Sequence, residues 1–160
     1  MSNMVNPLDG LLELQAGVDS NLQMVKCPGT SGLSVVFDQP QGVLRMTYAM
    51  IEDEIVIGYT VFIQDKPIGN ITVFDIGYAV LEKYRGKGLA TRIVNSSIGL
   101  FIDTIGTGGN FDNFYLEAIV GVGNFASIKI ANKVISDSPT KIVDKHSGED
   151  AYHFLRLINL

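Results

Sequence analysis

The sequence predicts a mixed α/β domain built on one sheet, spanning residues 1–160. Segments rich in β-branched and aromatic residues dominate the first half of the chain. Two segments with apolar residues at helical spacing then alternate with further strands. Strands first, followed by helices interleaved with strands, are typical of this fold class. The length of 160 residues and the hydrophobic content of 46% suit one domain with a substantial core.

The N-terminal part of the chain gives the weakest signals. Residues 11–24 predict one short helix that is broken at Gly17. A run of Pro, Gly, Thr and Ser at 28–32 predicts a loop. The apolar residues 33–37 after this loop predict a short strand.

A meander of three strands is expected next. Two strands at 43–51 and 54–64 flank an acidic turn at 52–53. The Asp-Lys-Pro segment at 65–67 predicts the turn into a third strand, which covers residues 71–80.

The second half of the chain alternates helices with strands. A helix over residues 88–105 is expected to end at Gly106, because glycine is favoured just after a helix. A second helix is expected over 124–135, with a break at the following Pro139. The remaining strands are expected at 114–120, 141–143 and 152–158.

The most informative segment is a glycine-rich turn between the strand at 71–80 and the helix that follows it. It reads RGKGLA over residues 85–90. Its glycines permit positive φ angles and close approach of a ligand to the backbone. The first amides of a helix lack partners and lie at the positive end of the helix dipole. Together with two cationic side chains, this turn predicts a phosphate-binding site.

The residues of this turn resemble a known motif. Arg85, Gly88 and Ala90 fit the pattern R-x-x-G-x-A, which resembles the acetyl-CoA pyrophosphate loop of the GNAT acetyltransferases. A second signature, N-x-x-S, begins at Asn124 and resembles the helix after the fifth strand in the branch that acetylates protein N-termini. The resemblance covers about residues 55–160, and residues 1–45 match the family poorly.

The resemblance implies a mainly antiparallel mixed sheet, flanked by helices, whose two central strands splay apart. The strands concerned would be those at 71–80 and 114–120, with the pantetheine arm of acetyl-CoA between them. Asn124 would bind this arm from one side, although an N-cap of its helix explains the residue equally well. The cofactor-binding residues implied are Ala79, Val80, Arg85, Gly86, Lys87, Gly88, Leu89, Ala90, Thr91 and Asn124.

The resemblance also implies an N-acetyltransferase reaction with acetyl-CoA and a primary amine as substrates. The catalytic candidates are Glu117 and Asp75, as bases whose pKa burial would raise, and Ser127, as the acid for the departing thiol. Many family members carry a tyrosine seven positions after the asparagine, where this chain has Ala131. This departure and Ser127 favour a protein or peptide N-terminus as the acceptor, with polyamines, aminoglycosides or amino acids as alternatives.

Two other functions fit part of the sequence. An acyl-CoA-binding module without transferase activity would keep the same loop. The segment GVGNFA at 121–126, followed by Asp144, also fits the G-x-G-x-x-A pattern of dinucleotide-binding domains. Because only a short stretch of chain follows Asp144, a doubly wound sheet does not fit after it.

Composition restricts the partners that we expect. A net charge of −5 argues against a nucleic-acid or anionic membrane surface. Cys27 is the single cysteine, so no internal disulfide forms, which favours the cytoplasm. His146 and His153 have no partners at metal-ligand spacing, so no metal site is expected. A homodimer is compatible with the sequence.

Overall fold

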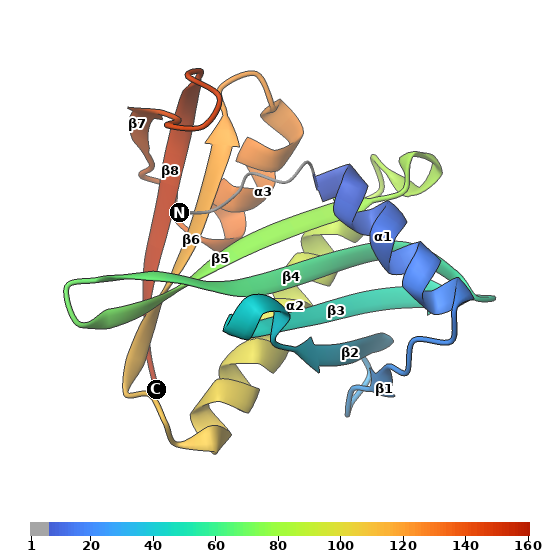
Figure 1. Ribbon diagram of the computed structural model, residues 1–160. Coiled ribbons are helices and arrows are strands. Elements are labelled where there is room, and N and C mark those ends of the chain that lie inside the picture. Colours follow the sequence, from blue (N-terminus) through green and yellow to red (C-terminus); the bar gives the residue numbers. More distant parts are fainter. Residues whose placement is uncertain (1–6) are drawn as a thin grey trace.

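An eight-stranded sheet with helices on both faces forms the body of the molecule (Figure 1). The structure is a computed structural model, and it describes residues 7–160. The helices are α1 (Pro7–Asp19), α2 (Leu89–Gly108) and α3 (Phe125–Val134), and short 3-10 turns cover Pro40–Gly42 and Glu82–Tyr84. The strands are β1 (Val25–Lys26), β2 (Leu33–Asp38), β3 (Arg45–Glu52), β4 (Ile55–Ile68), β5 (Ile71–Val80), β6 (Asn113–Gly121), β7 (Thr140–Val143) and β8 (Asp150–Asn159).

The strand order across the sheet is β1-β2-β3-β4-β5-β6-β8-β7. Every neighbouring pair is antiparallel except β5 and β6, which run parallel. The parallel pair is connected through α2, as a parallel crossover requires. This mainly antiparallel mixed sheet confirms the predicted fold class. No described helix has the length and apolar character needed to cross a bilayer.

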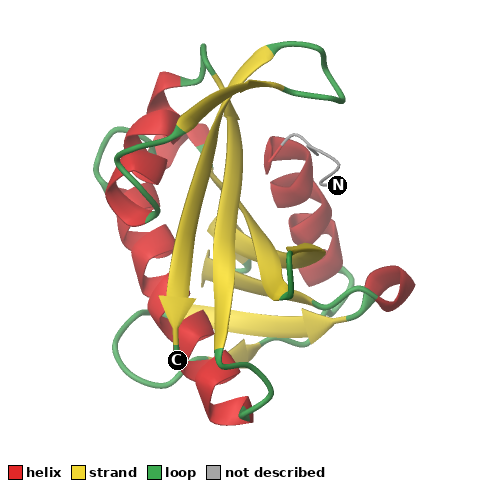
Figure 2. Ribbon diagram, turned by 90° about the vertical axis from the view of Figure 1, so that its left-hand side faces the viewer, coloured by secondary structure: helices red, strands yellow, loops and turns green. Residues whose placement is uncertain are grey.

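Helices α2 and α3 cover one face of the sheet, and α1 covers the other (Figure 2). The larger core lies under α2, where the rings of Phe62 and Phe101 stack with centroids 4.1 Å apart. A smaller core around Leu11 lies under α1. The Tyr59 hydroxyl donates to the Pro7 carbonyl at 2.8 Å and attaches the start of α1 to β4. Both faces of the central strands are therefore occupied.

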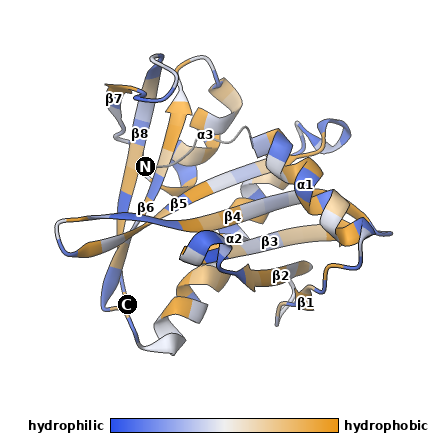
Figure 3. Cartoon of the chain, viewed as in Figure 1, coloured by the Kyte–Doolittle hydropathy of each residue, from blue (hydrophilic) through white to orange (hydrophobic). Residues whose placement is uncertain are grey.

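Burial alternates along β6, so its side chains alternate between the two faces of the sheet. The arrowhead end of this strand is coloured as hydrophobic in Figure 3. Phe114, Leu116, Ala118 and Val120 are buried on the face covered by α2 and α3. The intervening Glu117 therefore lies on the α1 face. Asp75 on β5 lies on this same face, because its neighbours Phe74 and Ile76 belong to the larger core.

Strands β5 and β6 pair over a short stretch only. Their register has three rungs, which join Val73 to Tyr115, Phe74 to Leu116 and Asp75 to Glu117. Beyond the last rung β5 continues on β4 and β6 continues on β8. The two strands thus part at Asp75 and Glu117, and the divergence of their backbones beyond this rung is here called the fork (Figure 1). This is the predicted splay of the central strands.

The ends of two helices differ from the sequence prediction. The first helix was expected over 11–24 and covers Pro7–Asp19, with Gly17 inside it. A Cβ at Gly17 would lie 3.3 Å from the Leu22 side chain, so the glycine allows the following chain to pack closely. Helix α2 continues past Gly106 to Gly108, because the left-handed residue that ends it is Gly109, with φ of 68°.

The hairpin between β4 and β5 is longer than expected. The segment 65–67 was predicted as the turn, but it lies inside β4, which runs to Ile68. The register shifts between Asp65 and Ile68, and this irregularity accommodates Pro67, which has no N–H to donate. The turn itself has Gly69 with φ of 61°. The added length places Asp65 opposite Val73, near the fork. The short edge strand β1 was not predicted.

Candidate active site

The glycine-rich turn between β5 and α2 is open to solvent. Gly86 and Gly88 have φ angles of 80° and 75°, in the left-handed region that favours glycine. A Cβ built on either residue meets no other atom within 4 Å. The turn is therefore not covered by neighbouring side chains, and its backbone is accessible to a ligand.

The start of α2 supplies free amides at this turn. The first bond of the helix runs from the Arg92 N–H to the Gly88 carbonyl at 3.1 Å. The earlier amides of Leu89, Ala90 and Thr91 have no partner within the helix. A hollow of about 260 Å³ lies beside them, lined by Tyr84, Lys87, Gly88, Leu89 and Arg92. Amides, helix dipole and cations together suit a diphosphate.

Two arginines have roles at this turn that the sequence pattern did not separate. The Arg85 Nε donates to the Val80 carbonyl at 3.0 Å, which ties the turn to the end of β5. Arg92 lines the hollow and was missed at the sequence level. It lies one helical turn after Gly88, and this spacing from the predicted phosphate-binding turn is the signal that could have found it.

The end of β5 has one edge without a strand partner. The Leu81 N–H bonds to the Ile57 carbonyl at 2.9 Å, so the antiparallel alternation turns the Ala79 N–H toward β4. The Val80 N–H points the other way, into the fork. Of the two residues predicted to bind the cofactor arm through their backbone, Val80 is the one whose N–H faces the opening.

Asn124 and Ser127 lie at the start of α3, across the fork from β5. The Asn124 side chain accepts a bond from the Ser127 N–H at 3.2 Å, which confirms its predicted role as an N-cap. The Tyr78 hydroxyl donates to the Ser127 carbonyl at 2.9 Å. Burial raises the pKa of Tyr78 to about 12, so its hydroxyl stays protonated and links β5 to α3.

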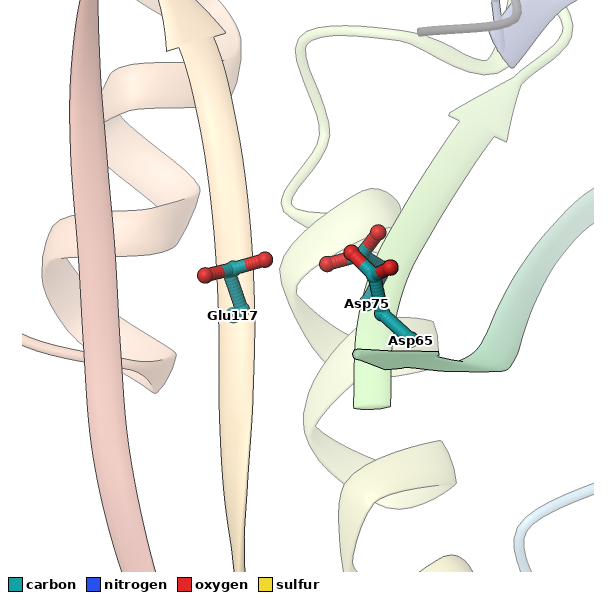
Figure 4. Close-up of side chains that lie close together, drawn as sticks. All are labelled: Asp65, Asp75 and Glu117. Atoms are coloured by element: carbon teal, nitrogen blue, oxygen red, sulfur yellow. The ribbon is translucent and has the colours of Figure 1, made fainter. Parts of the chain in front are cut away.

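Three carboxylates gather at the last rung before the fork. Asp65, Asp75 and Glu117 come from β4, β5 and β6, and each offers an oxygen within 4.8 Å of the others (Figure 4). The structure therefore brings the two predicted bases together and adds Asp65. Asp65 was missed because its segment was predicted as a turn rather than as a strand on this face.

His153 on β8 also belongs to this cluster. Its Nε2 lies 2.6 Å from the Glu117 Oε2. No partner was predicted for His153, because Glu117 is distant in the chain. The pairing of β6 with β8 places His153 opposite Ile119, one diagonal step from Glu117 on the same face.

The surroundings of these acids drive their ionisation in opposite directions. Burial raises the pKa of Asp75 to about 9, and the adjacent Glu117 and Asp65 carboxylates add to the effect. The hydrogen bond from His153 lowers the pKa of Glu117, against the opposing effect of burial. At neutral pH Glu117 is therefore the ionised acid and Asp75 the protonated one. The expected rise in pKa occurs at Asp75 and not at Glu117.

The features that suggested a dinucleotide site have other roles. Strand β6, which precedes the G-x-G-x-x-A segment, pairs antiparallel with β8, so the chain after α3 does not continue a parallel sheet. Asp144 is buried, and its carboxylate accepts bonds from the Ser147 hydroxyl at 2.8 Å and from the His146 N–H at 3.4 Å. This carboxylate stabilises the turn between β7 and β8. The G-x-G-x-x-A segment at 121–126 is therefore interpreted as a tight turn from β6 into α3.

Comparison with known proteins identifies the family of this architecture. Residues 23–133 match the family model described as the acetyltransferase (GNAT) family. This match covers more than half of the chain and includes the phosphate-binding turn, the fork and most of α3. A search of curated proteins found no significant match.

Several solved structures of acetyltransferases have a similar fold. A GNAT-family acetyltransferase from Streptococcus pneumoniae matches with a TM-score of 0.53 and 16% identity, over 72% of this chain and 67% of that one. A chimera of spermidine N-acetyltransferase from Vibrio cholerae matches with a TM-score of 0.53 and 16% identity, over 71% and 69%. The ribosomal-protein-S5-alanine acetyltransferase from Vibrio fischeri matches with a TM-score of 0.50 and 19% identity, over 94% and 69%.

Proposed function

The chain belongs to the GNAT family of acetyltransferases, and on this premise we propose that its acceptor is the α-amine of a protein or peptide. The protein is an acetyl-CoA-dependent N-acetyltransferase that acts on an amine. The observation that carries the proposed site is the position of the ionised Glu117 at the last rung before the fork, from which the edge of β5 without a strand partner runs to Val80 and the phosphate-binding turn. A proton acceptor thus lies at one end of this edge and the diphosphate site at the other, and the arm of the cosubstrate would lie between them.

The residues of the turn fit the diphosphate of acetyl-CoA. Gly86 and Gly88 leave their surroundings open, and the amides of Leu89, Ala90 and Thr91 have no helical partner. Arg85, Lys87 and Arg92 add positive charge beside them. The cosubstrate supplies the acetyl thioester, and the protein supplies its binding, its orientation and the proton transfers.

We assign the proton transfers to residues around the fork. Glu117 is the ionised carboxylate and accepts a proton from the acceptor ammonium, whose ordinary pKa lies well above neutrality. A backbone N–H on the fork edge of β5 polarises the carbonyl of the acyl group. The Ser127 hydroxyl, at the other side of the fork, supplies a proton to the departing sulfur. Asn124 orders the first turn of α3 so that Ser127 keeps its place.

The choice of a peptide α-amine has two supports. The first is Ser127 together with Ala131, at the place where many family members carry a tyrosine. The second is the fold of the ribosomal-protein-S5-alanine acetyltransferase from Vibrio fischeri, which is similar over 94% of this chain. The spermidine N-acetyltransferase chimera has the same fold and supplies the competing acceptor class.

A panel of acceptors tests the proposal. Purified protein, acetyl-CoA and each amine are mixed, and free thiol is followed with a colorimetric reagent. The panel contains a peptide with a free N-terminus, the same peptide with a blocked N-terminus, spermidine and an aminoglycoside. We expect thiol release with the free peptide, none with the blocked peptide, and acetylation at the α-amine by mass spectrometry.

The same panel separates the alternatives. A higher kcat/KM for spermidine or the aminoglycoside than for the peptide would overturn the peptide assignment and leave the enzyme class intact. Binding of acetyl-CoA without thiol release for any amine would indicate an acyl-CoA-binding module. Full turnover in both Glu117→Gln and Asp75→Asn would overturn the assignment of the base.

We also propose that residues 1–160 form one domain that works in the cytoplasm. Residues 1–6 of this expected domain lie outside the described residues. Across the described residues, both cores are built on the same sheet. Cys27, the single cysteine, has its pKa raised by burial and is therefore less reactive than an exposed thiol. Light scattering of the purified protein will show whether a homodimer forms.

A further inference from the structure

Glu117 and His153 form a short polar contact beside the fork. The Glu117 Oε2 and the His153 Nε2 lie 2.6 Å apart. The side chains are 13% and 26% exposed, so water screens this pair only partly. Because an ionised carboxylate only accepts hydrogen bonds, the His153 Nε2 carries the proton and donates it.

Both side chains occupy places that the sheet determines. Glu117 lies at the last rung between β5 and β6, and His153 lies on β8, which pairs with β6 along its whole length. One oxygen of Glu117 is thus held on the β8 side. The other is left on the side of β5 and the fork, where Asp75 lies (Figure 4).

We infer that His153 is a positioning residue for acetyl transfer, which holds one oxygen of Glu117 and leaves the other to receive the proton of the acceptor amine. This inference rests on the proposed function and names a residue that the sequence motifs do not contain. The acceptor ammonium loses two protons. One passes to Glu117 and then to water, and the other ends on the thiol after the carbon–sulfur bond breaks and the carbon–nitrogen bond forms.

The neighbours of this pair support a role for Glu117 as the proton acceptor. Asp75 from β5 is protonated and donates a hydrogen bond to Glu117. It therefore does not compete with Glu117 for the proton of the acceptor amine. Asp65 from β4 adds negative charge. On the other side, β7 places Thr140 opposite His153, and Thr140 does not titrate. Tyr115 shares the face of Glu117 on β6.

Two substitutions at His153 separate positioning from packing. His153→Ala removes the hydrogen bond, and we expect kcat to fall about 10- to 100-fold, the usual loss for a hydrogen bond to a charged group. The KM for acetyl-CoA should change less than about twofold, because the phosphate-binding turn lies past the end of β5, well beyond the rung of Asp75 and Glu117. His153→Gln keeps an N–H donor and should restore kcat to within about threefold of wild type.

The pH profile gives a readout that packing alone would not change. The hydrogen bond from His153 lowers the pKa of Glu117, so its loss in His153→Ala should raise that pKa and move the acid limb of kcat/KM to higher pH. His153→Gln keeps a donor, so its acid limb should stay close to that of the wild type. Assays contain EDTA, so that cations do not occupy the carboxylate cluster. His146→Gln, in the turn after β7, is the matched control and should behave as wild type.

The outcomes are distinguishable. Wild-type kcat and an unchanged pH profile in His153→Ala would overturn the inference while the proposed function stands. A loss in His153→Ala that glutamine does not restore, or one that leaves the acid limb at its wild-type pH, would assign His153 to packing and overturn the inference as well. If the wild type acetylates no amine, the proposed function fails first and the inference fails with it.

Discussion

At the scale of single residues, the environment of each carboxylate at the fork decides its chemical role. Asp75 and Glu117 lie on the same rung of the sheet, yet the pKa of one is raised and the pKa of the other is lowered. Burial acts on both, and the donor that His153 supplies to Glu117 makes the difference. Two adjacent acids thus hold one proton between them, with Glu117 left to act as the base.

The raised pKa of Asp75 predicts that the protein loses stability as the pH rises. The folded state keeps a proton up to about pH 9 that the unfolded state releases near the ordinary pKa of 3.8. The contribution of this group to the free energy of unfolding is therefore complete below the unfolded pKa. It is lost as the pH rises from there to the folded pKa, by at most about 1.4 kcal/mol per pH unit. The lowered pKa of Glu117 acts with the opposite sign at acid pH.

Thermal unfolding between pH 6 and pH 9 measures this effect. We expect the Tm of the wild type to fall with pH and the Tm of Asp75→Asn to change much less, because asparagine cannot ionise. Asp144→Asn is the contrasting variant. The bonds from Ser147 lower the pKa of Asp144, so replacing this carboxylate should lower the Tm across the whole pH range. Parallel pH profiles for the wild type and Asp75→Asn would contradict the assignment of the proton to Asp75.

A matched pair of glycines tests the phosphate-binding turn. Gly88 and Gly148 both have positive φ, 75° and 71°, and neither has an atom within 4 Å of a built Cβ. Valine at either position costs about 1–2 kcal/mol of backbone strain. We expect similar losses of stability in the two variants, but only Gly88→Val should lose affinity for acetyl-CoA, by at least about tenfold in calorimetry. Equal affinities would remove the turn from the binding site.

At the scale of elements, α3 is positioned by its first turn. The Ser127 N–H donates to the Asn124 side chain and the Ser127 carbonyl accepts from the Tyr78 hydroxyl, so both backbone polar groups of Ser127 are held. The helix start thus faces the end of β5 across the fork. A short helix of this kind depends on such contacts, because few of its own residues are buried.

Two substitutions at Asn124 separate its structural role from a contact with the cosubstrate. Asn124→Ala removes the cap and should cost about 1 kcal/mol of stability, which lowers Tm by about 2–4 °C. Asn124→Ser keeps a capping oxygen and should restore Tm. If the amide also binds the pantetheine arm, both variants lose affinity for acetyl-CoA in calorimetry. Wild-type affinity in Asn124→Ser would leave Asn124 with the cap alone.

The elements that the sequence predicted best have strong local signals. Strand β5 matches its expected bounds of 71–80, because β-branched and aromatic residues fill it and a polar segment ends it on either side. The hairpin tip was misplaced, because Pro67 signals a turn locally while the long pairing of β4 with β5 accommodates it as an irregularity. The pairing of β4 with β5 determines where β4 ends, and this pairing cannot be predicted from the residues around Pro67 alone.

At the scale of the whole molecule, topology creates the parts of the site that the sequence could not predict. The phosphate-binding turn is contiguous in the chain, so its motif was visible. Asp65, Glu117 and His153 are brought together only by the strand order β4-β5-β6-β8. Their registers determine which side chains meet, and a shift of one residue would move them to opposite faces. The family resemblance supplied the fork itself, and the three-rung register confirms it.

The three-rung pairing of β5 with β6 has a consequence for solubility. A strand edge with unpaired amides normally invites other chains to add to it, which leads to aggregation. Here such edges lie inside the sheet and belong to two strands that diverge from a fixed point, with α3 on one face. A strand from another copy could pair there only by entering between β5 and β6, which converge at the rung of Asp75 and Glu117. The unpaired amides are therefore less exposed to intermolecular pairing than those of an outer strand.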